Sequence, residues 1–132
     1  MPFPVEEKYI KAAEEELGVT FPDSVRASFM KMNGGEFTND ELEWDFYPFF
    51  DQSDRKRISR TANHIVRETM EARKWHNFPK RGVAIGRDSY GNLLMMHPKL
   101  LQRKKLQETI FFWNHETGEI VKAARTIDDI KV

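Results

Sequence analysis

The stretch "VAIGRDSYGNLLMM", residues 83–96, decides how the second half of the chain folds. Its two ends are apolar, and its middle contains the turn-forming residues Asp88, Ser89, Gly91 and Asn92. The glycine spacing resembles that of a phosphate-binding loop. However, Asn-Leu stands where such a loop has Lys and Ser or Thr, and a strand pattern follows instead of a helix. The stretch therefore predicts a β-hairpin and not a nucleotide site.

Other apolar runs extend this hairpin into a sheet. "TIFFWN" (109–114) and "EIVKAA" (119–124) are separated by "HETG", whose Gly118 suits a hairpin turn. Upstream, Trp44 and Phe46 alternate with a polar residue at strand spacing. Because proline cannot donate a ladder hydrogen bond, the nearby Pro48 predicts that this strand is an edge strand or ends there.

The remaining apolar residues recur at helical spacing. A first helix is predicted up to Gly18, and a second begins at Phe21-Pro22 and ends at "NGG", residues 33–35. A longer third helix is predicted from five positions: Ile58, Ala62, Ile65, Thr69 and Ala72. The sequence thus predicts an α+β fold, with two N-terminal helices and a longer third helix packed on one face of a mostly antiparallel sheet.

The bulk composition excludes several protein classes. The 132 residues suit one domain spanning residues 1–132. The chain has no cysteine, which excludes a disulfide scaffold, a thiolate metal site and a catalytic thiol. No apolar run approaches the roughly 20 residues that span a bilayer, and the N-terminus lacks a signal-peptide pattern. We therefore expect a cytoplasmic protein.

The charges are balanced overall but segregated along the chain. Lysine plus arginine and aspartate plus glutamate each number 21. One segment, residues 36–54, has acids and no lysine or arginine; its acids are Glu36, Asp40, Glu41, Glu43, Asp45, Asp51 and Asp54. Two basic clusters follow: Arg55, Lys56, Arg57 and Arg60, then Lys99, Arg103, Lys104 and Lys105. The acidic segment is either a solvated face or a contact surface for a basic partner.

No catalytic constellation stands out in the sequence. The chain lacks a G-x-S-x-G motif, and its four histidines stand apart: His64, His76, His97 and His115. A structural histidine is the ordinary interpretation for each. We therefore expect no catalytic, cofactor-binding or metal-binding residues. A pocket in which a histidine meets a carboxylate would revive an enzymatic interpretation.

The order of these elements resembles the SUKH superfamily, in the branch that contains the fungal cell-wall-synthesis regulator. Four stretches carry the resemblance: "IKAAEEELG" (10–18), Phe21-Pro22 opening a helix, "NGG" (33–35) ending it, and "VAIGRDSYGNLLMM" (83–96). "TIFFWNHETGEI" (109–120) resembles the next strand pair of the family. Together these features cover about residues 5–123. Relatives often end with a helix after the last strand, whereas this sequence stops at "TIDDIKV" (126–132), so we expect a terminal element that is short or absent.

The resemblance implies a non-enzymatic binding protein with an α+β fold. Many bacterial relatives look like immunity proteins that neutralise the domains of polymorphic or contact-dependent toxins by binding them. We therefore expect a protein partner, a toxin domain such as a cationic nuclease, with no cofactor and no direct contact with nucleic acid or membrane. The alternative is a stand-alone adaptor or regulatory scaffold with an endogenous partner in the cell envelope or in signalling.

The acidic segment is the candidate contact surface. Carboxylates can take the place of phosphates in front of a cationic partner and accelerate its approach. The hypothesis places six acids in this surface, with Trp44 as an anchor: Asp40, Glu41, Glu43, Asp45, Asp51 and Asp54. The alternative is that Trp44 belongs to the core and the acids only keep the protein soluble.

Overall fold

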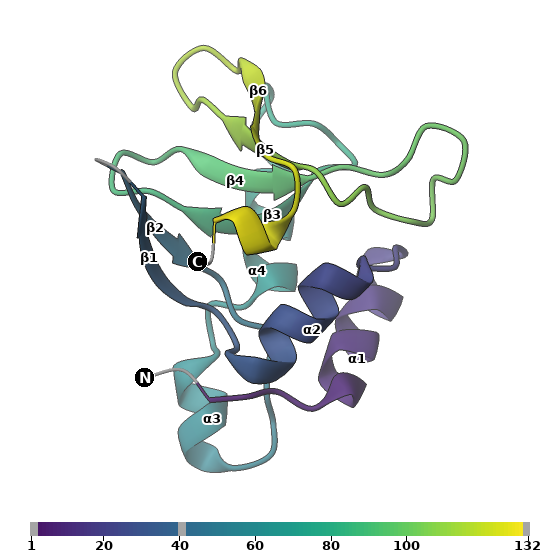
Figure 1. The fold of residues 1–132 in the computed structure, drawn as a ribbon, viewed down its shortest axis with the longest axis vertical. Coiled ribbons are helices and arrows are strands. Elements are labelled where there is room, and N and C mark those ends of the chain that lie inside the picture. Colours follow the sequence, from purple (N-terminus) through teal and green to yellow (C-terminus); the bar gives the residue numbers. More distant parts are fainter. Residues whose placement is uncertain (1–2, 40–41, 131–132) are drawn as a thin grey trace.

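The chain folds as a six-stranded antiparallel sheet with helices against it, so the predicted α+β class is confirmed (Figure 1). The computed structural model describes residues 3–39 and 42–130. The strands lie in the sheet in chain order: β1 (Gly35–Asn39), β2 (Leu42–Phe46), β3 (Val83–Arg87), β4 (Leu93–Met96), β5 (Ile110–Trp113) and β6 (Ile120–Ala124). The helices are α1 (Glu7–Leu17), α2 (Asp23–Lys31), α3 (Arg55–Arg60), α4 (Ile65–Ala72) and the short 3-10 helix η1 (Ile127–Asp129).

The two predicted N-terminal helices are confirmed, and a half-buried carboxylate fixes the elbow between them. α1 ends at Gly18, whose φ of 73° is the left-handed conformation that glycine accepts without strain. The Glu14 carboxylate accepts a hydrogen bond from the Phe21 amide at 2.7 Å and from Arg26 Nη2 at 2.6 Å. This pair of bonds ties the end of α1 to the start of α2.

The predicted long third helix is a pair of shorter helices, α3 and α4, which corrects that part of the prediction. The Thr61 hydroxyl donates back to the Arg57 carbonyl at 2.7 Å and accepts the Asp51 amide at 2.9 Å. His64 then adopts an extended conformation, and its Nδ1 caps α4. Side-chain bonds at these positions offer the backbone an alternative to helix, which is why the apolar period continues while the helix does not.

Both predicted hairpins of the second half are confirmed. At the β3–β4 turn, Asp88 Oδ1 accepts the amides of Tyr90 and Asn92 at 2.8 and 2.9 Å. Gly91 takes a φ of 93° there, and Gly118 takes a φ of 75° in the β5–β6 turn. Residues 83–96 therefore form a β-hairpin, and the Asp88 side chain accepts the backbone amides of its own turn.

The strand around Trp44 is interior, and its edge neighbour β1 is an element that the sequence did not predict. β2 lies between β1 and β3 and ends before Pro48. Of the two predicted alternatives, an edge strand or a strand that ends near Pro48, the structure shows the second. β1 contains one large apolar side chain, Phe37, which packs edge-on against Phe46 with ring centroids 5.6 Å apart. A five-residue strand with one such side chain gives little period-2 signal.

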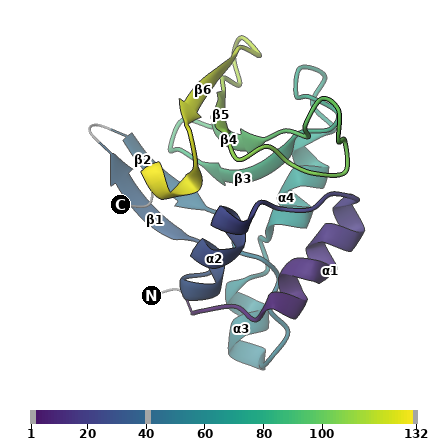
Figure 2. The same ribbon diagram turned by 45° about the vertical axis from the view of Figure 1, so that its right-hand side comes forward.

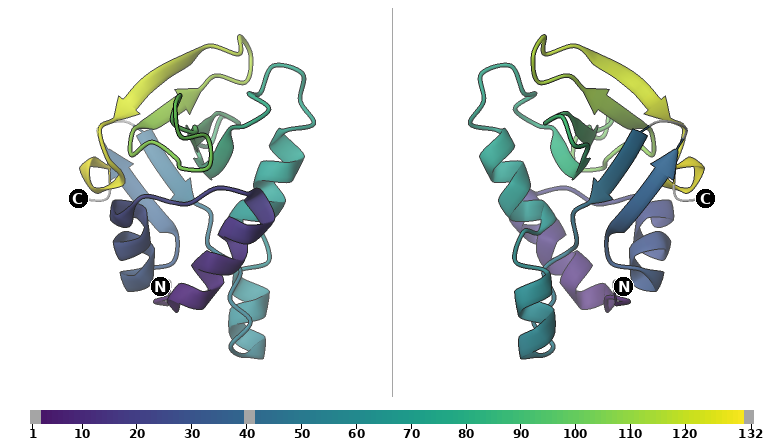
Figure 3. Two further views of the ribbon diagram at one scale, coloured as in Figure 1. Left: turned by 90° about the vertical axis from the view of Figure 1, so that its right-hand side faces the viewer. Right: turned by 90° about the vertical axis from the view of Figure 1, so that its left-hand side faces the viewer.

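The core lies between the helices and one face of the sheet (Figures 2 and 3). Phe29 of α2 meets Phe46 and Phe49 edge-on, with ring centroids 6.5 and 5.0 Å away. η1 contacts α2, and Ile127 and Ile130 are buried; of the two alternatives for residues 126–132, short or absent, the described residues show a short helix. Within the described residues, no helix is long and apolar enough to cross a bilayer.

Candidate functional site

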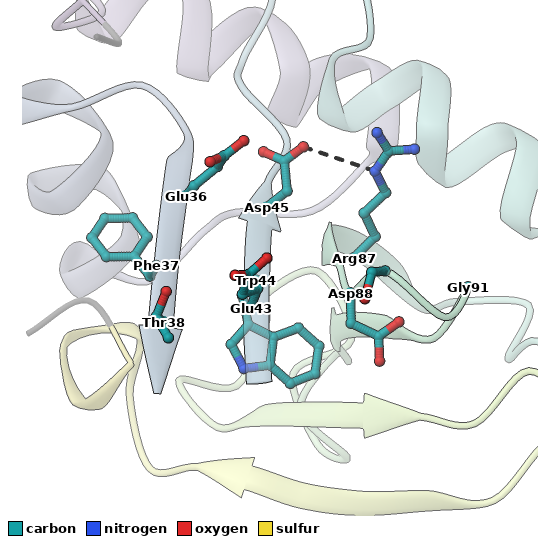
Figure 4. Close-up of a pocket in the computed structure, with 10 residues that line it drawn as sticks. Glu36, Phe37, Thr38, Glu43, Trp44, Asp45, Arg87, Asp88 and Gly91 are labelled. Atoms are coloured by element: carbon teal, nitrogen blue, oxygen red, sulfur yellow. Dashed lines mark ion pairs between the residues drawn. The ribbon is translucent and has the colours of Figure 1, made fainter. Parts of the chain in front are cut away.

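The alternation of β1 and β2 places three carboxylates on the side of the sheet away from Phe37 and Phe46. In the strand register Glu36 pairs with Asp45, and Thr38 pairs with Glu43. Successive side chains of a strand point to opposite faces, so these four residues share one face. Glu36 and Glu43 are exposed, and Asp45 is half-buried. We call the three carboxylates Glu36, Glu43 and Asp45 the acidic face (Figure 4).

The acidic face borders an open concavity of about 520 Å³. Its other wall comes from the end of β3 and the β3–β4 turn, including Arg87, Ser89 and Gly91. Arg87 pairs with Asp45, with Nε 3.8 Å from Oδ2, and Figure 4 shows this ion pair bridging the two strands. Neither Glu36 nor Glu43 forms an ion pair with any other residue that the structure describes. These two carboxylates are available to a cation from outside.

The pKa of the Asp45 carboxyl is raised, chiefly because the group is partly buried. Burial raises the pKa of the Asp45 carboxyl, the Arg87 guanidinium lowers it, and Glu36 raises it again. The net direction is upward, so the single arginine does not compensate for desolvation and repulsion together. A cationic group entering the concavity would relieve that repulsion.

The acidic face keeps its position because β2 and β3 approach closely at Gly86. A Cβ on Gly86 would lie 3.0 Å from the Asp45 carbonyl oxygen and 3.3 Å from Phe46 Cα. The Tyr47 amide then donates to the Ile85 carbonyl at 2.9 Å, just beyond the ladder. Glycine at this point lets Asp45 and Arg87 lie opposite each other in the register.

Two of the predicted contact residues, Asp51 and Asp54, lie away from this concavity and bond within the chain. Asp51 is 3% exposed; its Oδ1 accepts the Ser53 amide at 3.0 Å and its Oδ2 lies 3.8 Å from Arg57 Nε. Asp54 caps α3 by accepting the Arg57 amide at 2.8 Å, and Arg57 Nη1 lies 2.6 Å from its Oδ2. The hydrogen bond from the Arg57 amide lowers the pKa of Asp54.

The other predicted residues divide between the acidic face, the core and positions outside the described residues. Glu43 and Asp45 lie together on the acidic face. Trp44 is 5% exposed, lies at the floor of the concavity and meets Phe112 edge-on at 5.8 Å. Asp40 and Glu41 lie outside the described residues. Glu36 belongs to the acidic segment, but the sequence hypothesis did not include it in the contact surface. Its place beside Asp45 follows from the pairing of β1 with β2, and β1 was not predicted.

The first basic cluster has partners inside the protein. Arg57, Arg60 and Lys56 surround the Phe3 ring, with the Arg57 guanidinium 4.3 Å from its centroid. These cation–π contacts hold the N-terminal segment against α3. The position of these cations at a helix start is thus explained by Phe3 and by the two aspartates that Arg57 contacts.

One histidine, His64, is half-buried and shares a pocket with a carboxylate. His64 stacks on Phe50 at 4.7 Å, and both line a pocket of about 360 Å³ with Glu16. Burial lowers the pKa of His64, Glu16 raises it and Arg67 lowers it. No hydrogen bond or ion pair joins His64 to Glu16, and residues 3–39 and 42–130 contain no cluster of three metal-ligating side chains.

The comparison with protein families decides where this fold belongs. Residues 4–130 match the SMI1 / KNR4 family (SUKH-1). The chain belongs to this family. No curated protein and no solved structure matches the chain. The SUKH-1 match covers both the helical elbow and the hairpins on which the sequence resemblance depends, so the predicted superfamily is confirmed. The family is associated with immunity proteins and related regulatory domains that are generally non-catalytic.

Proposed function

We propose that this SUKH-1 protein is a non-catalytic immunity protein that neutralises a toxin domain by binding it through the acidic face. The observation that carries the proposal is the pair Glu36 and Glu43, two exposed carboxylates without an ion-pair partner among the described residues. They border an open concavity next to a third carboxylate, Asp45. Family membership supports a binding function, and the acidic face supports a cationic partner.

The physical mechanism is occlusion with electrostatic steering. A nuclease toxin carries cations that neutralise the phosphates of its substrate, and those cations attract carboxylates equally well. Complementary charge raises the association rate more than it raises the final affinity. Arg87 holds Asp45 in place at the rim, so Glu36 and Glu43 supply the uncompensated charge.

Of the residues predicted from sequence, Glu43 and Asp45 enter this proposal and Asp51 and Asp54 do not. The latter two are occupied by Arg57. Trp44 supports the concavity from beneath, because its ring is buried against Phe112. The contribution of the residues at 40 and 41 stays a prediction.

The first experiment identifies the partner. The protein is used as bait in a lysate of its native host at low and at moderate salt, and bound proteins are identified by mass spectrometry. A single toxin domain that is lost as salt rises is the expected result. That domain is then expressed with and without this chain, and rescue of growth tests neutralisation. Recovery of only endogenous cell-envelope or signalling proteins, without rescue, would replace the immunity function with that of an adaptor.

The second experiment assigns the surface. We expect Glu36→Lys with Glu43→Lys to lower the association rate for the toxin domain by about tenfold or more at low salt. The matched control, Glu116→Lys with Glu119→Lys, changes the net charge equally on the exposed β5–β6 turn and should leave the rate nearly unchanged. Equal rates for the two double variants would exclude the acidic face as the contact surface.

A further inference from the structure

The segment between β4 and β5, residues 97–109, carries the most exposed large apolar side chains among the described residues. Leu100 is 83% exposed and Leu101 is 94% exposed. We call this segment the basic loop, because Lys99, Arg103, Lys104 and Lys105 flank the two leucines. Figure 1 shows it extending away from the sheet and the helices. Two leucines at the tip of a projecting loop have no counterpart within the fold.

The base of the basic loop is fixed, so the exposure of its tip is imposed by the structure. The Thr20 amide donates to the Lys104 carbonyl at 2.7 Å, and the Leu106 amide donates to the Thr20 carbonyl at 3.0 Å. The Lys99 amide donates to the Lys105 carbonyl at 2.7 Å, which closes the loop on itself. Leu106 is buried, and the chain between these anchors points outward.

One side of the basic loop forms a cationic pocket of about 310 Å³. Five basic residues line it, from the loop and from the segment after α4: Arg73, Lys80, Arg81, Arg103 and Lys104. Leu17, Val19 and Pro98 form its apolar part, and no acid is among its lining residues. None of the five cations forms an ion pair with a residue in the described part of the chain. Arg73 Nε donates to the Gly82 carbonyl at 3.1 Å, which orients that side chain.

The opposite side of the basic loop has a different composition. There Lys99 and Lys105 line a shallow pocket together with Asp23 and Glu108. Mixed charge on that side makes it a poor site for a polyanion. The positive field is therefore concentrated on the side that contains Arg103 and Lys104.

We propose that the basic loop docks this protein on an anionic phospholipid surface, with a lipid phosphate in the cationic pocket and Leu100 and Leu101 in the interfacial layer. A bilayer surface offers diffuse negative charge directly above an apolar layer, and clusters of four to eight cations beside apolar side chains recognise that combination. The convex shape of the loop suits a deformable surface better than a protein pocket. Burial of the two leucines adds a favourable apolar term that a nucleic acid would not supply.

The orientation of the molecule is compatible with this docking. Figure 2 shows the basic loop and the segment after α4 on one side, and β1 and β2 on the other. The strands that carry the acidic face would thus lie on the side of the molecule far from an anionic membrane. The membrane proposal uses none of the acidic-face residues, so it stands or falls independently of the immunity function.

The test is sedimentation of the full chain with vesicles at low salt. The vesicles contain either phosphatidylcholine alone or phosphatidylcholine with phosphatidylglycerol. We expect binding only to the anionic vesicles. Arg103→Gln with Lys104→Gln should weaken it about 30-fold, since each cation near the surface contributes roughly fivefold. Leu100→Ser with Leu101→Ser should weaken it by about tenfold or more. The charge-matched control Lys122→Gln with Arg125→Gln, on and just after β6, should change binding little.

A second readout separates docking from a structural function of the cations, which lie near the carboxyl end of α1 and interact favourably with its dipole. The fluorescence of the variant Leu101→Trp should shift to the blue on anionic vesicles and not on neutral ones. The proposal is overturned if the wild-type protein does not bind anionic vesicles. It is also overturned if either double variant binds them like the wild type.

Discussion

The acidic segment of this chain, residues 36–54, has two parts that are both acidic but differ in their surroundings. In the strand half, residues 36–45, the described carboxylates project from β1 and β2 into an open concavity. In the loop half, residues 51–54, both aspartates bond within the chain and contact Arg57. A carboxylate in an acidic segment is therefore open to an outside cation only where no cation of the same chain is already paired with it, as at Glu36 and Glu43.

Local geometry explains why the two halves differ. Strand alternation separates the carboxylates of β1 and β2 from the core and gives only Asp45 a cation, Arg87 on the next strand. Asp54, by contrast, precedes a helix and accepts the Arg57 amide, which is the ordinary geometry of a capping aspartate. Arg57 lies three residues further on and so reaches the same carboxylate.

The largest expected effect on stability comes from a substitution at Gly86, where β3 approaches β2 closely. Gly86→Ala places a methyl group 3.0 Å from the Asp45 carbonyl oxygen and 3.3 Å from Phe46 Cα, and these backbone atoms of β2 cannot move away as the end of a flexible side chain can. We expect a loss of about 2–3 kcal/mol in the free energy of unfolding, measured in urea. Gly82→Ala is the control, because its added methyl meets the flexible end of Met95 and the Phe78 ring and should cost less. Equal losses would show that the approach of β2 to β3 is not the constraint.

The loop half should respond to loss of a single carboxylate. Asp51→Ala removes the acceptor of the Ser53 amide and leaves Arg57 with one partner fewer. We expect a loss of about 2 kcal/mol in unfolding free energy. Glu43→Ala, in the strand half, should stay within about 0.5 kcal/mol of the wild type, as exposed unpaired side chains do. A large loss at Glu43 would contradict the division of the acidic run into two halves.

The smallest effect is a difference in pH dependence. The lowered pKa of Asp54 means that its ionised form stabilises the fold above the unfolded-state pKa near 3.8, and this stability is lost as pH falls through the lower folded pKa. The raised pKa of Asp45 has the opposite sign, so its contribution grows more favourable as pH falls from the raised folded value toward 3.8. As pH falls below 3.8, the wild type should lose its advantage in urea midpoint over Asp54→Asn. As pH falls toward 3.8 from above, the wild type should instead gain in urea midpoint relative to Asp45→Asn. Parallel changes would refute the assignment.

Much of the fold was predictable because its signals are local. Asp88 and Gly91 predict the hairpin at 83–96, because both are turn formers. In the structure the Asp88 carboxylate accepts two amides of its own turn. The elbow between α1 and α2 is similarly marked by Gly18 and Pro22. By contrast, β1 depends on pairing with β2, and a single apolar side chain, Phe37, does not reveal it.

The candidate site was only partly predictable for the same reason. Composition identified the acidic run, but the separation of Glu43 from Asp51 depends on where Arg57 and Arg87 lie in space. The break between α3 and α4 depends on the Thr61 hydroxyl, whose partner Asp51 is ten residues away. Periodicity carries no information on such contacts, so the sequence grouped residues that the structure separates: Glu43 and Asp45 line the concavity, and Asp51 and Asp54 do not.

One measurement tests the central claim directly: the association rate of the captured toxin domain with two double variants of equal charge. Glu36→Gln with Glu43→Gln removes two negative charges from the strand half. Asp51→Asn with Asp54→Asn removes two negative charges from the loop half. We predict that the first pair slows association about tenfold at low salt without lowering the thermal midpoint. The second pair should lower the midpoint and leave the rate nearly unchanged. Equal slowing by both pairs would show that only net charge matters, and would contradict the assignment of the acidic face as the binding surface.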